Sequence, residues 1–466
     1  MFGNTGRGDL VRLNKNMVLK KLLFACLVLL AASLAPAQEE YCDCAYAPHD
    51  EEYKVALMVP LFLEQVTEEF FLSEPSNKTL DTKPFSFLDF YEGFMIAADS
   101  VANSRGMNLE LKVFDVDNSI AKAEEAIKDP WLEDVDLIVG PFYFKPFEVV
   151  RYFAAERNVL IINPITPRSN IVEDNPNVVK IKPSLSSQMF LLDSIIRRDY
   201  HSNNVFIISK DGTSNADVIS EIENVVRRNI DDFSYVSNKH IVDVIKKNHR
   251  RWKYLKIEFQ ESDFLTDNIS LDINILKNNL EDSVAFRNNV VTIDYSRDSL
   301  KLVKNYASAL RNNLFIVYGT DKVFANEIVN KVTKLTENYQ LTVIMLPEWG
   351  KYDGLFNENL MKMHAIYFDD AFIDYDNIRV GSFLCKFRDR FSSEPSGYAF
   401  LGFDIGWYFL NALHHYGDDM KMCIPYYRIP LLQTEFHFKR ESETSGYENT
   451  FWNVYQFIGY NKVLIK

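Results

Sequence analysis

Residues 136–168 place the strongest constraint on how this chain can fold. They predict, in order, a strand, a loop, a helix, a second strand and a second loop. Leu137–Val139 and Val159–Ile162 are short apolar runs without alternation, which is typical of strands covered on both faces, and the segment between them has helical periodicity. This pattern predicts a βαβ unit. Because parallel sheets bind ligands at the carboxyl ends of their strands, we expect Gly140–Lys145 and Asn163–Arg168 to open onto one crevice.

The same alternation continues along most of the chain. The other expected strands are Lys54–Leu61, Leu109–Phe114, Val178–Ile181, Asn204–Ser209, Val290–Ile293, Leu314–Tyr318, Leu341–Met345 and His364–Phe368. The expected helices include Phe85–Ser104, Ser119–Lys128, Ser214–Arg228, Ser299–Arg311, Asp321–Thr336, Ile378–Phe391 and Ser396–Tyr416, with one more beginning at Ser184 or Ser186. This order predicts an α/β protein whose mostly parallel sheets are flanked by helices.

Two intervals depart from this order. Residues 229–288 are polar, and we expect an insertion there around one or two further βα units. Near the end, Leu431–Phe438 and Phe451–Ile458 alternate in polarity and are separated by a polar turn. That pattern predicts an antiparallel hairpin attached to the α/β body.

The first 37 residues have the features of a cleavable signal peptide. Two lysines precede the apolar run Leu22–Leu34, and Ala35-Pro36-Ala37 supplies the small residues of a cleavage site before Gln38. Met17 is an alternative start. In a second interpretation Cys26 is acylated and the protein is a lipoprotein. Cleavage before Gln38 predicts a soluble periplasmic product that begins with a lead segment, residues 38–52.

Composition limits the partners of the chain. Its 466 residues are 47% hydrophobic and 25% charged, which is ordinary for a globular protein of two or three domains. The net charge of -14 makes nucleic acids and anionic membranes poor partners. Four cysteines follow the cleavage site, at spacings that specify neither a disulfide framework nor a zinc site: Cys42, Cys44, Cys385 and Cys423. For the first two we expect unpaired or locally bridged thiols.

Several short motifs occur in the order seen in one known family. They are Phe90-Tyr91-Glu92-Gly93, Phe114-Asp115-Val116-Asp117, Val139-Gly140-Pro141, Glu394-Pro395-Ser396 and Leu401-Gly402-Phe403-Asp404. With them, residues 53–466 resemble type 1 periplasmic binding proteins of the leucine/isoleucine/valine-binding class. Leu346–Trp349, Phe368–Asp376 and Ser445–Phe457 are similar to binding-protein domains that Bacteroidetes bacteria often fuse to LysM modules, which bind peptidoglycan.

The resemblance implies two lobes that are joined by three crossings and hold a ligand between them. Lobe one would comprise residues 53–182 and 372–418. Lobe two would comprise residues 183–371 and 419–466. Closure on a ligand would be a hinge movement at the crossings.

The resemblance also implies where a ligand would bind. Amino-acid binders of this class use small hydroxyl residues in the first cleft loop, where this chain has Phe142-Tyr143-Phe144-Lys145. An aromatic wall suits a peptide or a sugar-containing fragment better than a free branched-chain amino acid. The candidate ligand-binding residues are Tyr143, Phe144, Lys145, Thr166, Arg168, Thr213, Tyr318, Asp321 and Trp349. We expect Tyr143 to stack and Thr166 to donate or accept a directed hydrogen bond.

Each candidate also has a purely structural interpretation. Phe142 and Phe144 would pack beneath their loop, Thr166 would cap a turn, and Trp349 would belong to the core. The acidic cluster within Phe368–Asp376 favours a solvated crossing loop over a cation site, because it lacks the glycine and the ligand spacing of a calcium loop.

The sequence offers no motif for catalysis. It contains no G-x-S-x-G, no H-E-x-x-H, no P-loop and no G-x-G-x-x-G after the first strand, so we expect no enzyme, no cofactor and no metal. Two functions remain. One is a soluble receptor that delivers a small solute to a membrane transporter or sensor. The other is an envelope or peptidoglycan-associated scaffold whose old solute cleft is degenerate or binds cell-wall fragments. The oligomeric state stays open.

Overall fold

The structure is a computed structural model that describes residues 52–65, 85, 87–210, 215–247, 278–298, 300–347, 349, 355, 357–458 and 461–465. The predicted signal peptide, the lead segment with Cys42 and Cys44, the alternative lipoprotein residue Cys26 and the candidate Thr213 lie outside these residues. Within the described part of the chain, no helix is both long and apolar enough to cross a membrane.

The first sheet has seven strands among the described residues, in the order β13-β14-β5-β4-β3-β1-β2. Its strands are β1 (Glu52–Val59), β2 (Asn108–Asp115), β3 (Leu137–Val139), β4 (Leu160–Asn163), β5 (Val178–Lys180), β13 (Phe438–Lys439) and β14 (Tyr447–Asn449). Every neighbouring pair is parallel except β13 and β14. The predicted βαβ unit is confirmed, because β3 and β4 are fully buried and adjacent, with a helix between them in sequence.

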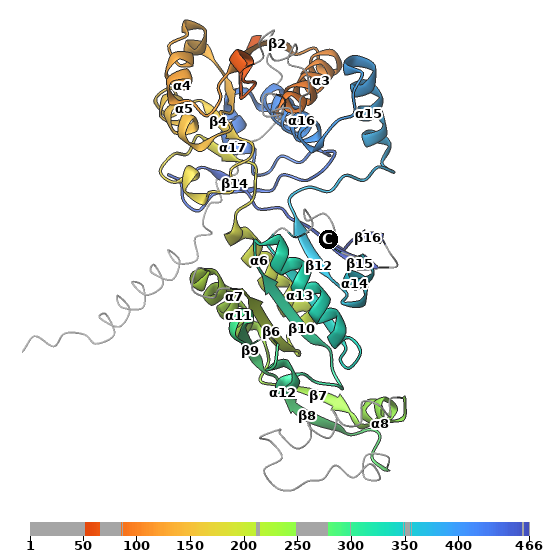
Figure 1. The fold of residues 1–466 in the computed structure, drawn as a ribbon. Coiled ribbons are helices and arrows are strands. Elements are labelled where there is room, and N and C mark those ends of the chain that lie inside the picture. The colour runs from red at the N-terminus through yellow and green to blue at the C-terminus, as the bar shows by residue number, and fades with distance from the viewer. Residues whose placement is uncertain are drawn as a thin grey trace, which may run out of the picture. The chain divides into compact units, whose positions relative to one another are not determined.

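Helices cover both faces of this sheet (Figure 1). They are α3 (Leu88–Arg105), α4 (Ile120–Ala126), α5 (Phe144–Glu156), α15 (Ile378–Phe391), α16 (Gly397–Tyr416) and α17 (Met420–Cys423). One face packs Ala56, Met58 and Ile138 against side chains of α4 and α5. Figure 1 shows α3, α15 and α16 on the other side. This sheet with its helices is called the first lobe.

Helices α3 and α16 approach each other closely although some 300 residues separate them. A Cβ atom on Gly93 would lie 1.9 Å from the carbonyl oxygen of Ala399, and one on Gly402 would lie 2.0 Å from that of Phe90. Real Cβ atoms do not come that near a backbone atom, so both positions require glycine. Helix α16 therefore packs on the first lobe, although residues 183–371, expected in the other lobe, precede it in sequence.

The second sheet also has seven strands among the described residues, in the order β16-β15-β12-β11-β10-β6-β9. Its strands are β6 (Asn204–Ser209), β9 (Val290–Asp294), β10 (Asn313–Tyr318), β11 (Leu341–Leu346), β12 (Ile366–Asp369), β15 (Asn453–Ile458) and β16 (Asn461–Leu464). The strands from β9 to β12 pair in parallel, whereas β15 pairs antiparallel with both β12 and β16.

Alternate residues of these strands face two separate apolar cores. Val205 and Ile207 contact side chains of one set of helices, whereas Phe206 and Ile208 contact those of another. The helices are α6 (Leu185–Ile195), α7 (Ala216–Asn229), α11 (Tyr295–Asp298), α12 (Val303–Tyr306), α13 (Lys322–Leu335) and α14 (Asn357–Lys362). This sheet with its helices is called the second lobe. The α/β class with two mostly parallel, helix-flanked sheets is thus confirmed.

The polar interval contains a small subdomain. Its strands β7 (Phe233–Ser237) and β8 (Ser283–Arg287) form an antiparallel pair, and α8 (Asn238–Lys247) follows β7. Val236, Ile241 and Phe286 form its buried core together with Leu310. Residues 248–277 of the predicted insertion lie outside the described residues.

The chain passes between the two sheets three times. It leaves the first sheet after β5, returns after β12, and leaves again between β14 and β15. The crossings contact one another: Lys182 Nζ lies 3.6 Å from an Asp370 carboxylate oxygen, and Glu448 accepts a hydrogen bond from the backbone N–H of Ser184 at 2.7 Å.

The predicted C-terminal antiparallel hairpin is confirmed, but it does not form between the predicted segments. Leu431–Phe438 and Phe451–Ile458 do not pair with each other; β13 pairs with β14 in the first sheet, and the C-terminal hairpin is β15 with β16 in the second. Residues 438–449 therefore join the first sheet, not the second lobe as expected. Alternation shows that a segment has two different faces, but it does not identify the strand that pairs with it.

The expected helix Ser299–Arg311 is also mostly wrong, because only α12 is helical there among the described residues. Leu300 has a φ of 63°, and Asn313 holds the following loop. Its amide donates to the carbonyl oxygens of Ser308 and Gln340, while its own oxygen accepts from the backbone N–H of Ser308. These bonds favour a loop over the helix that local propensity suggests.

Candidate functional site

The loops after β3 and β4 lie side by side at the carboxyl edge of the first sheet. The buried Asn163 joins them: its amide nitrogen lies 3.1 Å from the carbonyl oxygen of Pro141, and its oxygen accepts from the backbone N–H of Thr166 at 2.9 Å. Gly140, with a φ of 92°, leaves β3 so close to β1 that a Cβ would lie 2.1 Å from the carbonyl oxygen of Met58. Buried hydrogen bonds and this close backbone contact thus fix the conformation of both loops.

Tyr143 lies at the centre of this edge. It is the N-terminal cap residue of α5, and its ring is half-buried. Phe87 contacts it edge to face, with ring centroids 6.2 Å apart, and the Phe87 ring also lies 4.9 Å from that of Tyr398. Burial raises the pKa of Tyr143, and the neighbouring Tyr398 and Asp117 raise it further, so the phenol stays protonated and can donate a hydrogen bond at neutral pH.

The residues on either side of Tyr143 have different roles. Phe142 is 1% exposed and packs against Phe90 at 4.7 Å, so it belongs to the core. Phe144 is half-buried beneath the Arg168 guanidinium, which lies 4.6 Å from the ring centroid. Lys145 is exposed. The two loops and the start of α5 together therefore present one half-buried phenol, on Tyr143, and two cationic side chains, Lys145 and Arg168.

Thr166 serves the turn. It is 7% exposed, and its hydroxyl accepts from the backbone N–H of Arg168 at 3.4 Å. The structural interpretation of this residue, a turn cap, therefore matches the geometry. The turn would have to rearrange and expose Thr166 before a ligand could contact its hydroxyl.

A charged cluster lies near Tyr143 at the ends of β1 and β2. The Asp115 carboxylate accepts from three successive backbone N–H groups, those of residues 61–63, at 2.8–3.0 Å. Lys122 Nζ lies 3.0 Å from Asp117 and 3.8 Å from Asp115. Burial alone would lower the pKa of Lys122, but its hydrogen bond to Asp117 and the nearby carboxylates of Asp115 and Glu64 raise it.

The carboxyl edge of the second sheet contains the remaining candidates. Tyr318 is 7% exposed and belongs to an apolar core. Trp349 is 1% exposed, its indole N–H donates to the carbonyl oxygen of Gly319 at 2.6 Å, and its ring meets Phe324 edge to face. Neither residue offers an open ring face here. Asp321 caps α13 through the Val323 N–H and forms a 2.9 Å ion pair with the exposed Lys210.

Four of the predicted site residues thus lie at one edge of the first sheet: Tyr143, Phe144, Lys145 and Arg168. Three others are buried: Thr166, Tyr318 and Trp349. Sequence reasoning missed Phe87 and Tyr398, which flank Tyr143, and the pair of Asp117 and Lys122. Phe87 and Tyr398 come from the starts of α3 and α16, so only the tertiary contact between those helices reveals them.

The acidic residues at the end of β12 and in the loop after it do not form one cluster. Asp369 is buried and accepts from the Tyr455 hydroxyl at 2.6 Å, whereas Asp370 faces Lys182. Asp374 accepts from the backbone N–H of Asp376. In the part of the chain that the structure describes, no three His, Cys, Asp or Glu side chains are grouped in a way that could hold a metal ion.

Comparison with known proteins identifies the fold. No protein-family model and no curated protein matches the sequence. A structure titled as a candidate branched-chain amino acid ABC transporter from Rhodospirillum rubrum is similar at a TM-score of 0.57 and 9% identity, over 89% of this chain and 100% of that one. Full-length LpoA from Haemophilus influenzae is similar at a TM-score of 0.50 and 13% identity, over 93% of this chain and 62% of that one. Two seven-stranded sheets, three crossings and these likenesses show that the chain has the two-lobed fold of type 1 periplasmic binding proteins.

Proposed function

We propose that this chain is an exported, non-catalytic binding protein that holds a small ligand at the carboxyl edge of its first sheet. The observation that carries the proposal is the half-buried Tyr143, which lies beside Phe87 and Tyr398 with its phenol protonated. The ring can stack on a flat or apolar ligand while the hydroxyl donates a hydrogen bond. Arg168 and Lys145 add positive charge, which suits a peptide or cell-wall fragment with a carboxylate.

The polar groups at this edge suit binding better than chemistry. Lys122 is held as an ammonium by neighbouring carboxylates, so it cannot act as a general base at neutral pH. Asp115 uses its oxygens for three backbone N–H groups. Both side chains therefore stabilise the loops at this edge. We propose that the ligand is bound and released without a chemical reaction.

The proposal includes export and a ligand held between two lobes. We take lobe one as residues 53–182 and 372–449, which adds α17 and the strands at 438–449 to the expected ranges, and lobe two as residues 183–371 and 450–466. Cleavage before Gln38 would release a periplasmic protein. Cys423 is disulfide-bonded, whereas Cys385 is free and exposed. A disulfide suits an oxidising compartment outside the cytoplasm.

A thermal-shift screen of free amino acids, dipeptides and tripeptides, and muropeptides tests the proposal. A ligand that binds only the native state adds about 2.7 kcal/mol of stability when its concentration is about 100 times Kd, so Tm must rise. We expect peptides or muropeptides to raise Tm and free branched-chain amino acids to leave it unchanged. If no compound shifts Tm, or if free leucine gives the largest shift, the proposal fails.

A scaffold function is the second candidate, and the burial of Thr166, Tyr318 and Trp349 favours it. A cleft whose candidate residues are used in packing resembles a degenerate one. The likeness to LpoA concerns the fold alone and does not decide between the two candidates. Under the scaffold hypothesis, every compound in the screen leaves Tm unchanged, and the protein is retained on cross-linked envelope or peptidoglycan fractions instead.

A further inference from the structure

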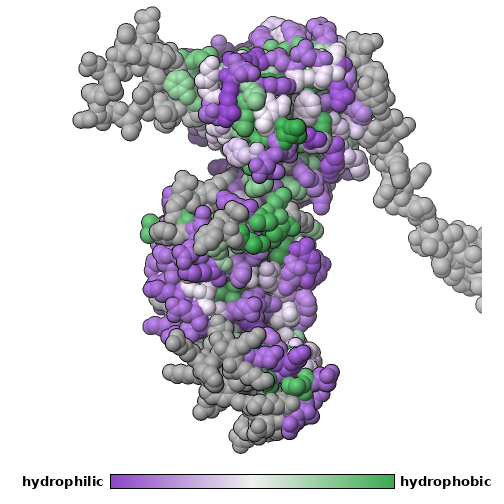
Figure 2. Space-filling view, turned by 90° about the vertical axis from the view of Figure 1, so that its right-hand side faces the viewer, coloured by the Kyte–Doolittle hydropathy of each residue, from purple (hydrophilic) through white to green (hydrophobic). Residues whose placement is uncertain are grey.

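The first lobe has a groove that is lined by other residues than those around Tyr143. Its walls are α3 and α15, its floor is α16, and the segment at residues 429–432 closes one end. The volume is about 1100 Å³. Figure 2 views the lobe from the α15 side, and hydrophobic residues lie there among hydrophilic ones.

Two adjacent stripes on α16 create this groove. Gly402 and Gly406 lie against α3, where a Cβ on Gly406 would come within 2.9 Å of the Ala97 Cβ. The neighbouring stripe, Phe403 and Trp407, lines the groove. Because residues four apart share one helix face, the small stripe brings α3 close and the large stripe remains in the space beneath α15.

The floor of the groove is aromatic. Phe403 and Trp407 are half-buried and stack in parallel, with ring centroids 5.9 Å apart and an interplanar angle of 9°. Phe383 of α15 lies 5.0 Å from Phe403 and closes the floor on one side. A planar or hydrocarbon body would bury its surface well on such a floor.

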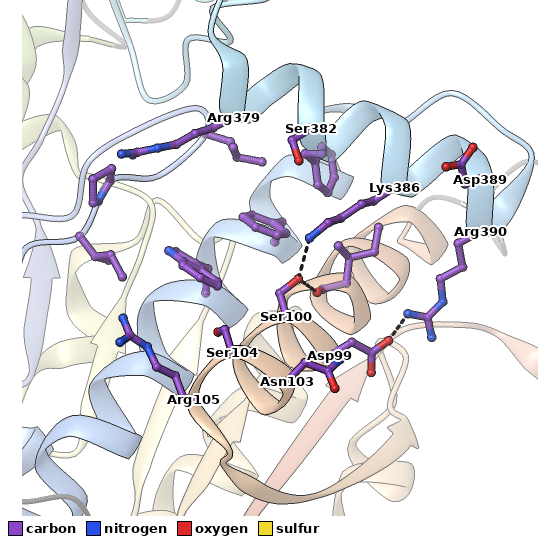
Figure 3. Close-up of a pocket in the computed structure, with 17 residues that line it drawn as sticks. Asp99, Ser100, Asn103, Ser104, Arg105, Arg379, Ser382, Lys386, Asp389 and Arg390 are labelled. Atoms are coloured by element: carbon purple, nitrogen blue, oxygen red, sulfur yellow. Dashed lines mark hydrogen bonds and ion pairs between the residues drawn. The ribbon is translucent and has the colours of Figure 1, made fainter.

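The rim of the groove is cationic. Arg105 from α3 and Arg379 from α15 lie at the same end of the groove, and Lys386 reaches across the middle to Ser100 (Figure 3). Lys386 Nζ lies 3.3 Å from the Ser100 hydroxyl, and Arg105 Nε donates to Asn411 at 3.2 Å. Among the described residues, no carboxylate forms an ion pair with any of these three cations, whereas Arg390 at the other end pairs with Asp99.

We propose that this groove binds a small amphiphilic organic anion. The apolar body lies on Phe403 and Trp407. Its carboxylate, sulfonate or phosphate lies between Arg105 and Arg379, within reach of Lys386. Three cations that form no ion pair with a carboxylate of the described residues, in a chain of net charge -14, provide the charge complementarity. The site is distinct from the edge around Tyr143 and does not depend on the function proposed for that edge.

A fluorescence titration with anilinonaphthalene sulfonate, an aromatic body that carries one sulfonate, tests the groove. The double variant Arg379→Ala/Lys386→Ala removes two exposed cations and should fold normally. We expect its affinity for the probe to fall about 10- to 100-fold, as for the loss of two charge-assisted contacts. Lys304→Ala on α12, an exposed lysine of the second lobe, is the matched control and should leave the affinity unchanged.

Competition defines the chemistry of the ligand. Dodecanoate at monomeric concentrations should displace the probe, and dodecyltrimethylammonium of the same chain length should not. Unchanged probe affinity in the double variant, or equal displacement by both amphiphiles, would overturn the proposal. So would a dimer in sedimentation that dissociates as the probe binds, since the occupant would then be a second copy. If Tyr143→Ala abolishes probe binding and the double variant does not, the probe occupies the site around Tyr143. The groove proposal then fails, while the function proposed for that edge stands.

Discussion

Asp404 is a carboxylate buried completely inside the first lobe. It lies on α16 and accepts from the backbone N–H groups of Leu432 and Gln433 at 2.7 and 3.0 Å. Burial raises its pKa to about 7, although the two backbone donors oppose the shift. The Asp404 side chain thus holds residues 432–433 against α16. Its protonation state changes within the physiological range of pH.

The raised pKa of Asp404 predicts the direction of a pH effect on stability. The folded pKa lies above the unfolded value of 3.8, so this contribution to stability is fully present below about pH 4 and is lost as pH rises through about 7. Asp404→Asn should remove this pH dependence. The Tm of the wild type minus the Tm of the variant should therefore fall as pH rises from about 4.5 to about 7.5. The measurement is a series of thermal melts across that range.

Glu92 provides the control for this effect, because burial and the nearby Asp89 also raise its pKa to about 7. Glu92→Gln should leave the Asp404 contribution in place. Parallel curves for wild type and Asp404→Asn at every pH would contradict the assignment to Asp404.

At the residue scale the sequence predicted the surroundings of Phe142 and Tyr143, whereas the ligand-binding role of Tyr143 stays a prediction. Alternation after a buried strand separates Phe142, which enters the core, from Tyr143, which does not. The roles of Thr166 and Trp349 could not be predicted, because a hydroxyl in a turn or an indole after a strand has the same local pattern in either environment. Only the 3.4 Å bond to the Arg168 N–H and the 2.6 Å bond to the Gly319 carbonyl distinguish them.

At the scale of elements, strands β1 to β6 and β9 to β12 were predicted within a few residues, most of them because they are apolar runs between turn residues. Strands β7, β8, β13, β14 and β16 were not predicted. The pairing of the C-terminal segments was not predictable in this way. Phe436 and Phe438 pack on Tyr408, and the backbone N–H of Leu432 donates to Asp404, so the segment joins the first lobe through contacts with α16. No local pattern encodes that choice. The aromatic floor on α16 was not predicted, although Phe403 and Trp407 stand four residues apart beside the glycines Gly402 and Gly406.

The glycines of these helices allow a matched test of the α3–α16 contact. Gly402→Ala places a methyl group 2.0 Å from the Phe90 carbonyl oxygen, so the helices must separate, and we expect a loss of about 1–3 kcal/mol or more, as for overpacking. Gly381→Ala on α15 meets nothing within 4 Å and should gain up to about 1 kcal/mol from helix propensity. Urea unfolding of both variants measures these changes; equal effects would mean that α3 and α16 are not in such close contact.

At the scale of the whole molecule, a buried ion pair joins two segments that lie next to crossings between the lobes. Lys180 at the end of β5 is fully buried, and its Nζ lies 3.4 Å from the Glu448 carboxylate of β14. Burial lowers the pKa of Lys180 to about 8 although Glu448 opposes the shift. The first and third crossings therefore share one ion pair close to where the chain leaves the first sheet.

Glu448→Gln tests this pair while keeping an oxygen for the Ser184 N–H. A buried ammonium without its carboxylate is strongly destabilised, so we expect the free energy of unfolding to fall by about 3–5 kcal/mol. Glu443→Gln, at an exposed position in the turn between β13 and β14, should change it by less than about 0.5 kcal/mol. Urea unfolding at pH 7 is the measurement, and equal effects of the two substitutions would contradict the role of the pair.

The central claim is that the two-lobed fold binds a small ligand through Tyr143, and calorimetric titration tests it most directly. The compound is whichever one gives the largest thermal shift, and the proteins are wild type, Tyr143→Ala and Tyr152→Ala. Tyr152 lies on the same helix with 63% of its surface exposed, so it is the matched control. We predict that Tyr143→Ala weakens affinity about 10- to 1,000-fold, that Tyr152→Ala leaves it unchanged, and that neither alters the ligand-free Tm greatly. Equal affinities in all three proteins would contradict the account.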